Sequence, residues 1–139
     1  MRLVVDASVA LKWFLRANSD EQYLTHAEAV AATIERSETE LFAPVHWMAE
    51  IISVLARIEP SVVDDALLFL DDMRPAVIDS MPVLRRAAEL SIALNHHLFD
   101  TLYHAVALEE GATLVTADET HFNKAKGLGS IVSLADFSV

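Results

Sequence analysis

Four acidic residues occupy positions next to or inside apolar segments, where a carboxylate without a function would be unfavourable. Asp6 directly follows the apolar run LVV, and Asp118 lies two residues beyond the apolar run TLVT. Asp100 stands at the start of a helical pattern, whereas Glu50 lies inside the apolar segment VHWMAEIISVLARI. An unpaired carboxylate on a buried face is costly. Because ligands bind beyond the carboxyl ends of parallel strands, we expect these acids to face one rim of a sheet.

Four carboxylates gathered at one rim need something to neutralise them, because like charges raise one another's pKa. A divalent hard cation meets that need, since Mg²⁺ and Mn²⁺ prefer carboxylate oxygen. Such an ion can lower the pKa of a bound water, orient a phosphodiester and stabilise the charge that builds up on it. Two divalent ions would balance the four negative charges. The pattern therefore predicts a metal site that hydrolyses phosphate esters.

Each acid also has a simpler interpretation. Asp is among the residue types preferred at helix N-caps, so Asp6, Asp100 and Asp118 could each be a cap. Glu50 could form an ion pair with Arg57 on the same helix. Convergence separates the two interpretations, because capping does not require four acids to lie together.

The elements that would position these acids alternate along the chain. We expect strands at 3–5, 41–43, 76–78, 113–116 and 131–133. Helical patterns lie between them, interrupted at Asn18-Ser19-Asp20, with Pro44 placed to start one helix and Gly111 to end another. Alternation of this kind predicts an α/β fold, a three-layer α/β/α sandwich around a mostly parallel sheet of about five strands. We expect one domain spanning 1–139.

Composition narrows the class of protein. The 139 residues are 53% hydrophobic, with three glycines and four prolines, which is typical of a compact globule. A formal net charge of −11 argues against nucleic-acid binding by charge alone, so an enzyme of this kind that acts on nucleic acid would need metal ions. The lack of cysteine fits a reducing cytosol. The apolar N-terminal run is too short for a signal peptide and no segment could cross a bilayer, so we expect a cytoplasmic protein without membrane contact.

Four stretches together resemble the PIN-domain ribonucleases: VVDASVALKWF, WMAEIISVL, FDTLYHAVALEEGATLVTAD and the trailing THF. Within that family the chain is most similar to the VapC-type toxins of toxin–antitoxin pairs. The resemblance covers nearly the whole chain and implies a parallel, usually five-stranded sheet with Mg²⁺- or Mn²⁺-dependent endonucleolytic cleavage of RNA. It makes Asp6, Glu50, Asp100 and Asp118 the catalytic and metal-binding residues.

The same resemblance assigns further residues and partners. Ser8 and Thr116 would be supporting polar groups beside the metal, and Tyr103 and Ala107 would be packing positions. A homodimer is implied, as is a cognate antitoxin laid across the active-site groove. Many members carry another Asp or Asn shortly after the last acid. Here Glu119-Thr120-His121 fills that stretch, and we place His121 on the surface.

The remaining candidates are histidines and a few cations. None of the six histidines falls in an established zinc pairing such as HExxH, and His104 is the one that we expect near the acids. Cations for RNA phosphates could come from two pairs that flank the expected rim. These pairs are Lys12 with Arg16 and Lys124 with Lys126.

Other functions stay open. Within the family, the alternatives are a housekeeping nuclease without an antitoxin and a non-catalytic partner-binding domain. Outside it, an aspartyl-phosphate phosphatase also has an Asp after its first strand but usually has a second acid two residues later, where this chain has Ser8. A signalling receiver domain is weaker, because no suitable lysine follows the late strands.

Overall fold

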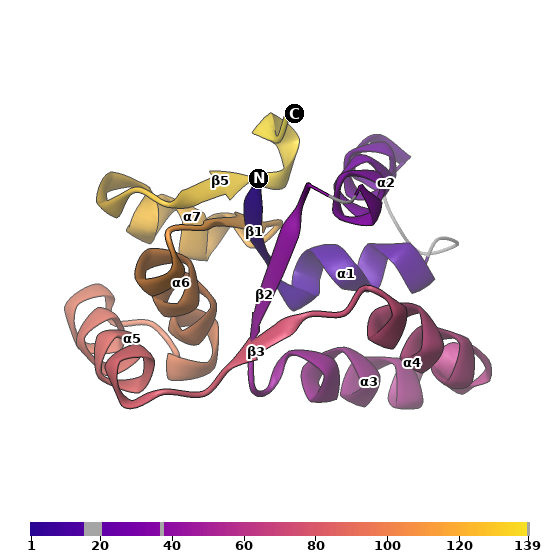
Figure 1. Ribbon diagram of the computed structural model, residues 1–139, viewed down its shortest axis with the longest axis horizontal. Helices are drawn as coiled ribbons and strands as arrows, with labels where there is room; N and C mark the ends of the chain where they lie inside the picture. Colours follow the sequence, from indigo (N-terminus) through magenta and orange to yellow (C-terminus); the bar gives the residue numbers. More distant parts are fainter. Residues whose placement is uncertain (16–20, 37, 139) are drawn as a thin grey trace.

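The computed structural model describes residues 1–15, 21–36 and 38–138. Within these ranges five strands form one parallel sheet in the order β3-β2-β1-β4-β5 (Figure 1). The strands are β1 (Arg2–Val5), β2 (Glu40–Pro44), β3 (Ala76–Ile78), β4 (Thr113–Thr116) and β5 (Ile131–Ser133). The expected strands at five places along the chain are thus confirmed.

Helices cover both faces of the sheet. In Figure 1, α5 and α6 lie on one side and α1 to α4 on the other, which confirms the expected three-layer α/β/α architecture. No helix of the described part is long and apolar enough to cross a membrane. The break expected at residues 18–20 lies outside the described residues. The helices are α1 (Ala7–Phe14), α2 (Glu21–Glu35), α3 (Trp47–Ile58), α4 (Val63–Asp72), α5 (Met81–Leu94), α6 (Leu98–Glu110) and α7 (Glu119–Ala125), with short 3₁₀ segments η2 (Pro60–Val62), η3 (Lys126–Leu128) and η4 (Leu134–Asp136).

The helix start expected at Pro44 is wrong. Pro44 is the last residue of β2 and pairs in register with Ile78 of β3, whereas α3 begins at Trp47. A residue that precedes proline favours the extended conformation. Parallel pairing with β3 then carries the strand on to the proline itself.

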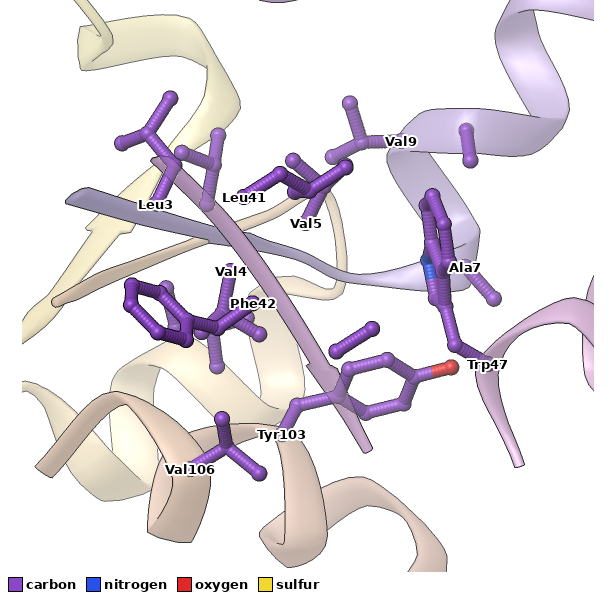
Figure 2. Packing of buried hydrophobic residues seen from close by; sticks show 14 of the residues in the cluster. Leu3, Val4, Val5, Ala7, Val9, Leu41, Phe42, Trp47, Tyr103 and Val106 are labelled. Atoms are coloured by element: carbon purple, nitrogen blue, oxygen red, sulfur yellow. The ribbon is translucent and has the colours of Figure 1, made fainter. Parts of the chain in front are cut away.

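Both faces of β1 are buried, which explains its unbroken apolar sequence. Val4 points toward Phe42 of β2 and Val106 of α6, whereas Leu3 and Val5 point to the opposite side (Figure 2). All five side chains are buried. Burial on both faces is typical of strands in parallel sheets.

Two large aromatic side chains fill the core beneath the carboxyl ends of β1 and β2. Trp47 at the start of α3 is 1% exposed, and Tyr103 of α6 is wholly buried. Figure 2 shows the Tyr103 hydroxyl directed toward Trp47 and Ala7, the first residue of α1. The starts of α1 and α3 and the first half of α6 are thereby brought together at one end of the sheet.

The chain changes direction between β1 and β4. From β1 it builds outward through β2 to β3, and then returns to add β4 and β5 on the other side of β1. The amide of Asp6 donates to the Val115 carbonyl at 3.0 Å, so the ends of the two strands are joined. In open α/β sheets such a switch point is where ligands bind.

Helix α6 is fixed at both ends. The Thr101 hydroxyl donates to the Ala87 carbonyl of α5 at 2.8 Å. At the other end Gly111 takes the left-handed conformation, with φ +63, and the Ala112 amide donates to the Ala107 carbonyl at 2.9 Å. The expected glycine end of this helix is confirmed, and it turns the chain directly into β4.

Replacing Gly111 with alanine should therefore destabilise the fold. We expect Gly111→Ala to lower the free energy of unfolding by about 1 kcal/mol, because an L side chain is strained at this φ. A Cβ there would meet only Arg2 Nη1 at 3.6 Å, so crowding adds nothing. Gly127→Ala is the control, since nothing lies within 4 Å of its Cβ position. Urea unfolding measures both variants; equal stability of the two would contradict the argument.

Candidate active site

Asp6 ends β1 and caps α1. Its Oδ2 accepts a hydrogen bond from the Ser8 amide at 3.0 Å, and the residue is 6% exposed. Burial raises the pKa of Asp6 to about 6; the hydrogen bonds from Ser8 oppose the shift, and the charges of Asp100 and Asp118 add to it. The carboxylate is therefore held in a place that disfavours its charge.

Asp118 caps α7 in the same way, beyond the end of β4. Its Oδ1 accepts from the His121 amide at 3.1 Å. The Thr116 hydroxyl accepts from the Asp118 amide at 3.0 Å, and the Ser8 hydroxyl accepts from the Ala117 amide at 3.1 Å. The two hydroxyls thus fix the backbone that carries Asp118 and tie it to the start of α1.

Capping and convergence occur together. Asp6 and Asp118 are N-caps, whereas Asp100 lies in the first turn of α6, where His97 is the cap residue. Asp118 accepts one backbone amide, whereas Asp6 accepts from both the amide and the side chain of Ser8. A carboxylate has about four acceptor sites, so both residues keep sites for an ion. A cap therefore does not prevent either aspartate from binding an ion.

Asp100 lies beside a histidine that the sequence did not single out. Its Oδ2 is 2.9 Å from His96 Nε2. His96, Asp100 and Asp118 each offer one ligand atom such that all three atoms lie within 4.8 Å of one another. These residues open, with Lys124, onto a cavity of about 740 Å³.

Glu50 points to the same region from α3. Its Oε1 accepts from the Tyr103 hydroxyl at 3.4 Å, and its Oε2 lies 3.5 Å from His46 Nε2. The expected ion pair with Arg57 is not found among the described residues, because Arg57 lies two turns, about 10 Å, farther along α3. Burial raises the pKa of Glu50 to about 7, and the charges of Asp6 and Asp100 add to the shift while the Tyr103 hydrogen bond opposes it.

The two side chains beside Glu50, Tyr103 and His46, are both neutral. Burial, together with the charges of Asp6 and Glu50, raises the pKa of Tyr103 above its ordinary value, so the hydroxyl keeps its proton. Burial lowers the pKa of His46. Its Nε2 lies 2.8 Å from the Phe99 carbonyl, which can only accept, so Nε2 carries the ring proton. That proton is used by the Phe99 carbonyl, so Glu50 accepts its hydrogen bond from Tyr103, and the neutral His46 ring lies beside its other oxygen.

The four acids share one electrostatic field without forming one tight cluster. Asp6 is influenced by Asp100 and Asp118, and Glu50 by Asp6 and Asp100. In the described ranges, however, the group close enough to hold an ion through three ligand atoms joins Asp100 and Asp118 to a histidine. Asp6 and Glu50 lie outside this group but interact with its aspartates through their charges.

His121 is fully buried, so its expected place on the surface is wrong. The ring of His121 stacks on His96, with centroids 4.7 Å apart and planes 11° apart, and neither ring nitrogen has a hydrogen-bond partner among the described residues. Burial lowers the pKa of His121 to about 4, and the neighbouring imidazole of His96 adds to the lowering. His104 is also buried, and its Nε2 lies 2.8 Å from the Gly129 carbonyl.

His96 was missed because the helical pattern breaks around it. Asn95 ends α5 in the left-handed conformation, with φ 49, and α6 starts only at Leu98. The spacing of four residues between His96 and Asp100 therefore lies across a turn. The available signal was the position of His96 directly after Asn95, because Asn is a residue type that can end a helix.

The candidate cations differ in whether they lie beside the acids. Lys124 Nζ donates to the Asn95 carbonyl at 2.9 Å and lies 3.3 Å from His96 Nδ1. Lys12 Nζ lies 5.6 Å from the centre of the Tyr23 ring and lines a separate, smaller cavity. Lys126 is exposed, and Arg16 lies outside the described residues. Lys124 is thus the cation that the fold brings to the acids.

The donor set fits a divalent cation. Asp100 and Asp118 supply carboxylate oxygens from different elements, and both open onto the cavity. Mg²⁺ and Mn²⁺ take such oxygens and retain several waters. A positive ion would also relieve the repulsion that raises the pKa of Asp6 and Glu50.

Comparisons with known proteins agree with this geometry. A family model described as PIN domain matches residues 3–128. A search of curated proteins finds no match. Among solved structures, VapBC-1 from nontypeable Haemophilus influenzae is similar with a TM-score of 0.67 at 14% identity, covering 98% of this chain and 100% of that chain.

Two further structures have the same fold. PAE2754 from Pyrobaculum aerophilum is similar with a TM-score of 0.62 at 19% identity, covering 96% of this chain and 90% of that chain. VapBC2 from Rickettsia felis, bound to a DNA fragment from its promoter, gives a TM-score of 0.63 at 18% identity, covering 96% of this chain and 97% of that chain.

Removing the charge of Asp6 should stabilise the metal-free protein at neutral pH. The folded-state pKa of about 6 exceeds the ordinary 3.8, so the destabilisation is absent below pH 3.8, grows between the two values and is fully present above pH 6. We expect Asp6→Asn to raise the free energy of unfolding by about 1 to 3 kcal/mol at pH 8 in the presence of a chelator. Near pH 4 the difference should disappear.

Urea unfolding at the two pH values measures this effect. Exposed Asp79, outside the helices and strands, supplies the control Asp79→Asn, which should change stability little at either pH. A gain for Asp6→Asn that is the same at pH 4 and pH 8 would contradict the electrostatic explanation.

Proposed function

The chain belongs to the PIN domain family, and from this premise we propose that it is a metal-dependent endoribonuclease that hydrolyses RNA phosphodiester bonds. The proposal names Asp6, Glu50, Asp100 and Asp118 as the catalytic and metal-binding residues and Mg²⁺ or Mn²⁺ as the cofactor. RNA is proposed as the substrate because the sequence motifs resemble those of PIN-domain ribonucleases.

One observation carries this proposal. Four acids from four separate segments influence one another at the switch point of the sheet, and the pKa of Asp6 rises to about 6 and that of Glu50 to about 7. Carboxylates kept together against their own repulsion and desolvation are unfavourable for stability. Strongly shifted pKa values in a cleft are typical of functional sites.

Asp100 and Asp118 are best placed to hold a divalent ion, because their oxygens converge at the cavity. A divalent ion bound there supplies Lewis-acid polarisation of the phosphodiester and neutralises the charge that develops during hydrolysis. Asp6 lies near enough to these two residues for their charges to raise its pKa. Ser8 and Thr116 act as supporting groups, since their hydroxyls hold the backbone of the Asp118 loop.

Glu50 is suited to accept a proton. Burial is the largest cause of its raised pKa and persists when an ion relieves the repulsion from Asp6 and Asp100, so the carboxylate stays more basic than an exposed one. The Tyr103 hydroxyl donates to Glu50 Oε1, and the His46 ring lies 3.5 Å from Oε2. We assign to Glu50 the removal of a proton from the attacking water.

RNA must be held by a protein whose net charge is −11. The cavity of about 740 Å³ beside the acids provides the space, and Lys124 provides a cation at its wall. The phosphate next to the scissile bond would lie against Lys124. Binding should then depend on the divalent ion, because one lysine cannot offset the repulsion of the surrounding acids.

Solved structures of similar fold include complexes named VapBC, which supports a toxin of a toxin–antitoxin pair with a cognate antitoxin as partner. A housekeeping PIN nuclease without an antitoxin and a non-catalytic partner-binding domain are the alternatives. A small upstream reading frame encoding a basic or DNA-binding protein would favour the toxin. Retention of all four acids argues against the non-catalytic alternative.

We also propose a cytoplasmic homodimer in which residues 1–139 form one domain. Most apolar side chains of α3 and α4 are at least partly buried, but Leu68 is 71% exposed and Leu67 is 39% exposed on α4. Val45 and Ile58 near the ends of α3 are also exposed. Exposed apolar groups of this kind favour self-association.

Cleavage of RNA by the purified protein tests the proposed function. We expect cutting of structured RNAs with Mg²⁺ or Mn²⁺ and none with a chelator. Asp6→Ala and Asp100→Ala should lower the rate by roughly 100-fold or more, because they remove carboxylates that stabilise transition-state charge through the ion. Asp79→Ala is the matched control and should cut at the wild-type rate. Equal cutting by all four proteins would reject the site.

Sedimentation tests the dimer. We expect the wild-type protein to sediment as a dimer at micromolar concentration and Leu68→Glu to shift it toward the monomer, because a charge on an apolar contact is unfavourable. Ile92, 83% exposed on α5, gives the control Ile92→Glu, which should leave the dimer intact. A wild-type monomer would end the dimer proposal, and dissociation by Ile92→Glu alone would move the interface to α5.

A further inference from the structure

We propose that His96 is a nitrogen ligand of the divalent ion and that, with Asp100 and Asp118, it forms a mixed nitrogen and oxygen site selective for transition metals over Mg²⁺. The inference rests on the proposed function for the presence of an ion at this place. It goes further by naming a ligand outside the four acids and by setting the order of metal preference.

The spacing of the atoms carries the argument. His96 Nε2 and Asp100 Oδ2 are 2.9 Å apart. Two neighbouring ligands of an octahedral ion with bonds of about 2.1 Å lie about 3.0 Å apart. The ligand atoms of all three residues fall within 4.8 Å of one another. These separations allow one ion to contact all three residues.

The position of the His96 ring is fixed by packing against other buried rings. Its side chain is only 8% exposed, and it stacks on His121 with planes 11° apart. His121 in turn meets the edge of His104 at 6.2 Å between centroids, and His104 is bonded to the Gly129 carbonyl. This row of three buried rings leaves His96 Nε2 directed at Asp100. A ligand fixed in advance loses little side-chain entropy on binding.

The ring proton must move when an ion binds. Lys124 can only donate, so His96 Nδ1 accepts from it, and Nε2 carries the proton and donates to Asp100 Oδ2. An ion at Nε2 takes the place of that proton, which then resides on Nδ1. Lys124 is repelled by the ion and keeps its bond to the Asn95 carbonyl at 2.9 Å.

Imidazole changes which ions the site prefers. Mg²⁺ binds oxygen ligands and gains little from a nitrogen. Affinity of a nitrogen-containing site rises from Mn²⁺ through Co²⁺ to Ni²⁺. A site with His96 should therefore bind Co²⁺ more tightly than Mn²⁺, and both more tightly than Mg²⁺.

His96→Gln separates a metal ligand from a residue that only positions Asp100. Glutamine can still donate a hydrogen bond to Asp100 Oδ2 but offers no imidazole nitrogen. His97→Gln is the matched control, because His97 is the adjacent histidine and lines the same cavity. Binding of Mg²⁺, Mn²⁺ and Co²⁺ is measured by calorimetry on the full chain at pH 7.5. Electron spin-echo spectra of the Mn²⁺ complex report coupling to an imidazole nitrogen.

We expect nitrogen coupling in the wild-type and His97→Gln complexes and none in His96→Gln. Co²⁺ affinity should fall about 10- to 100-fold in His96→Gln, at least the loss seen when a metal ligand's partner is removed, while Mg²⁺ affinity stays nearly unchanged. Coupling that is absent from the wild type or persists in His96→Gln would overturn the inference. If the wild type cuts RNA without nitrogen coupling, only the inference fails; if it neither binds an ion nor cuts RNA, the proposed function fails with it.

Discussion

Repulsion among carboxylates gathered between β1 and β4 is the constraint on which the other features depend. Asp6 is 6% exposed, so little water screens its charge, and its pKa and that of Glu50 both rise. The fold sustains this arrangement through backbone caps, the Tyr103 hydroxyl and the packing of α6 across β1, β2 and β4. A native core can tolerate a few kcal/mol of such unfavourable energy locally when the rest of the structure compensates.

The elements could be read from the sequence wherever local chemistry decides the conformation. Strands buried on both faces leave uninterrupted apolar runs, and Gly111 ends α6 because only the left-handed conformation fits there. Strand order could not be read, because nothing in a single strand states which neighbours it will pair with. Pro44 was misplaced for a related reason, since its pairing with Ile78 of β3 outweighs its preference for a helix start.

The positions of the acids relative to the strands and helices identified them in the sequence. The side chains that contact these acids could not be identified in that way. An aspartate directly after a strand is visible in the sequence, and so is a glutamate inside an apolar helix. The partners of Glu50 and the stacking of His121 on His96 depend on how α3, α6 and α7 meet. Contacts of this kind join residues distant in the chain, so spacing alone favoured Arg57 as a partner and the surface as the place of His121.

The pairing of β1 with β4 also sets when the site can form. Val5 lies beside Val115, and the Asp6 amide is bonded to its carbonyl, so the first acid meets its neighbours only after more than 100 residues have been made. Contacts between residues this far apart in the chain form late in folding. During synthesis the chain therefore stays without its complete set of acids until β4 and Asp118 have left the ribosome. The complete set of acids is therefore a property of the nearly finished chain, and no shorter nascent segment contains it.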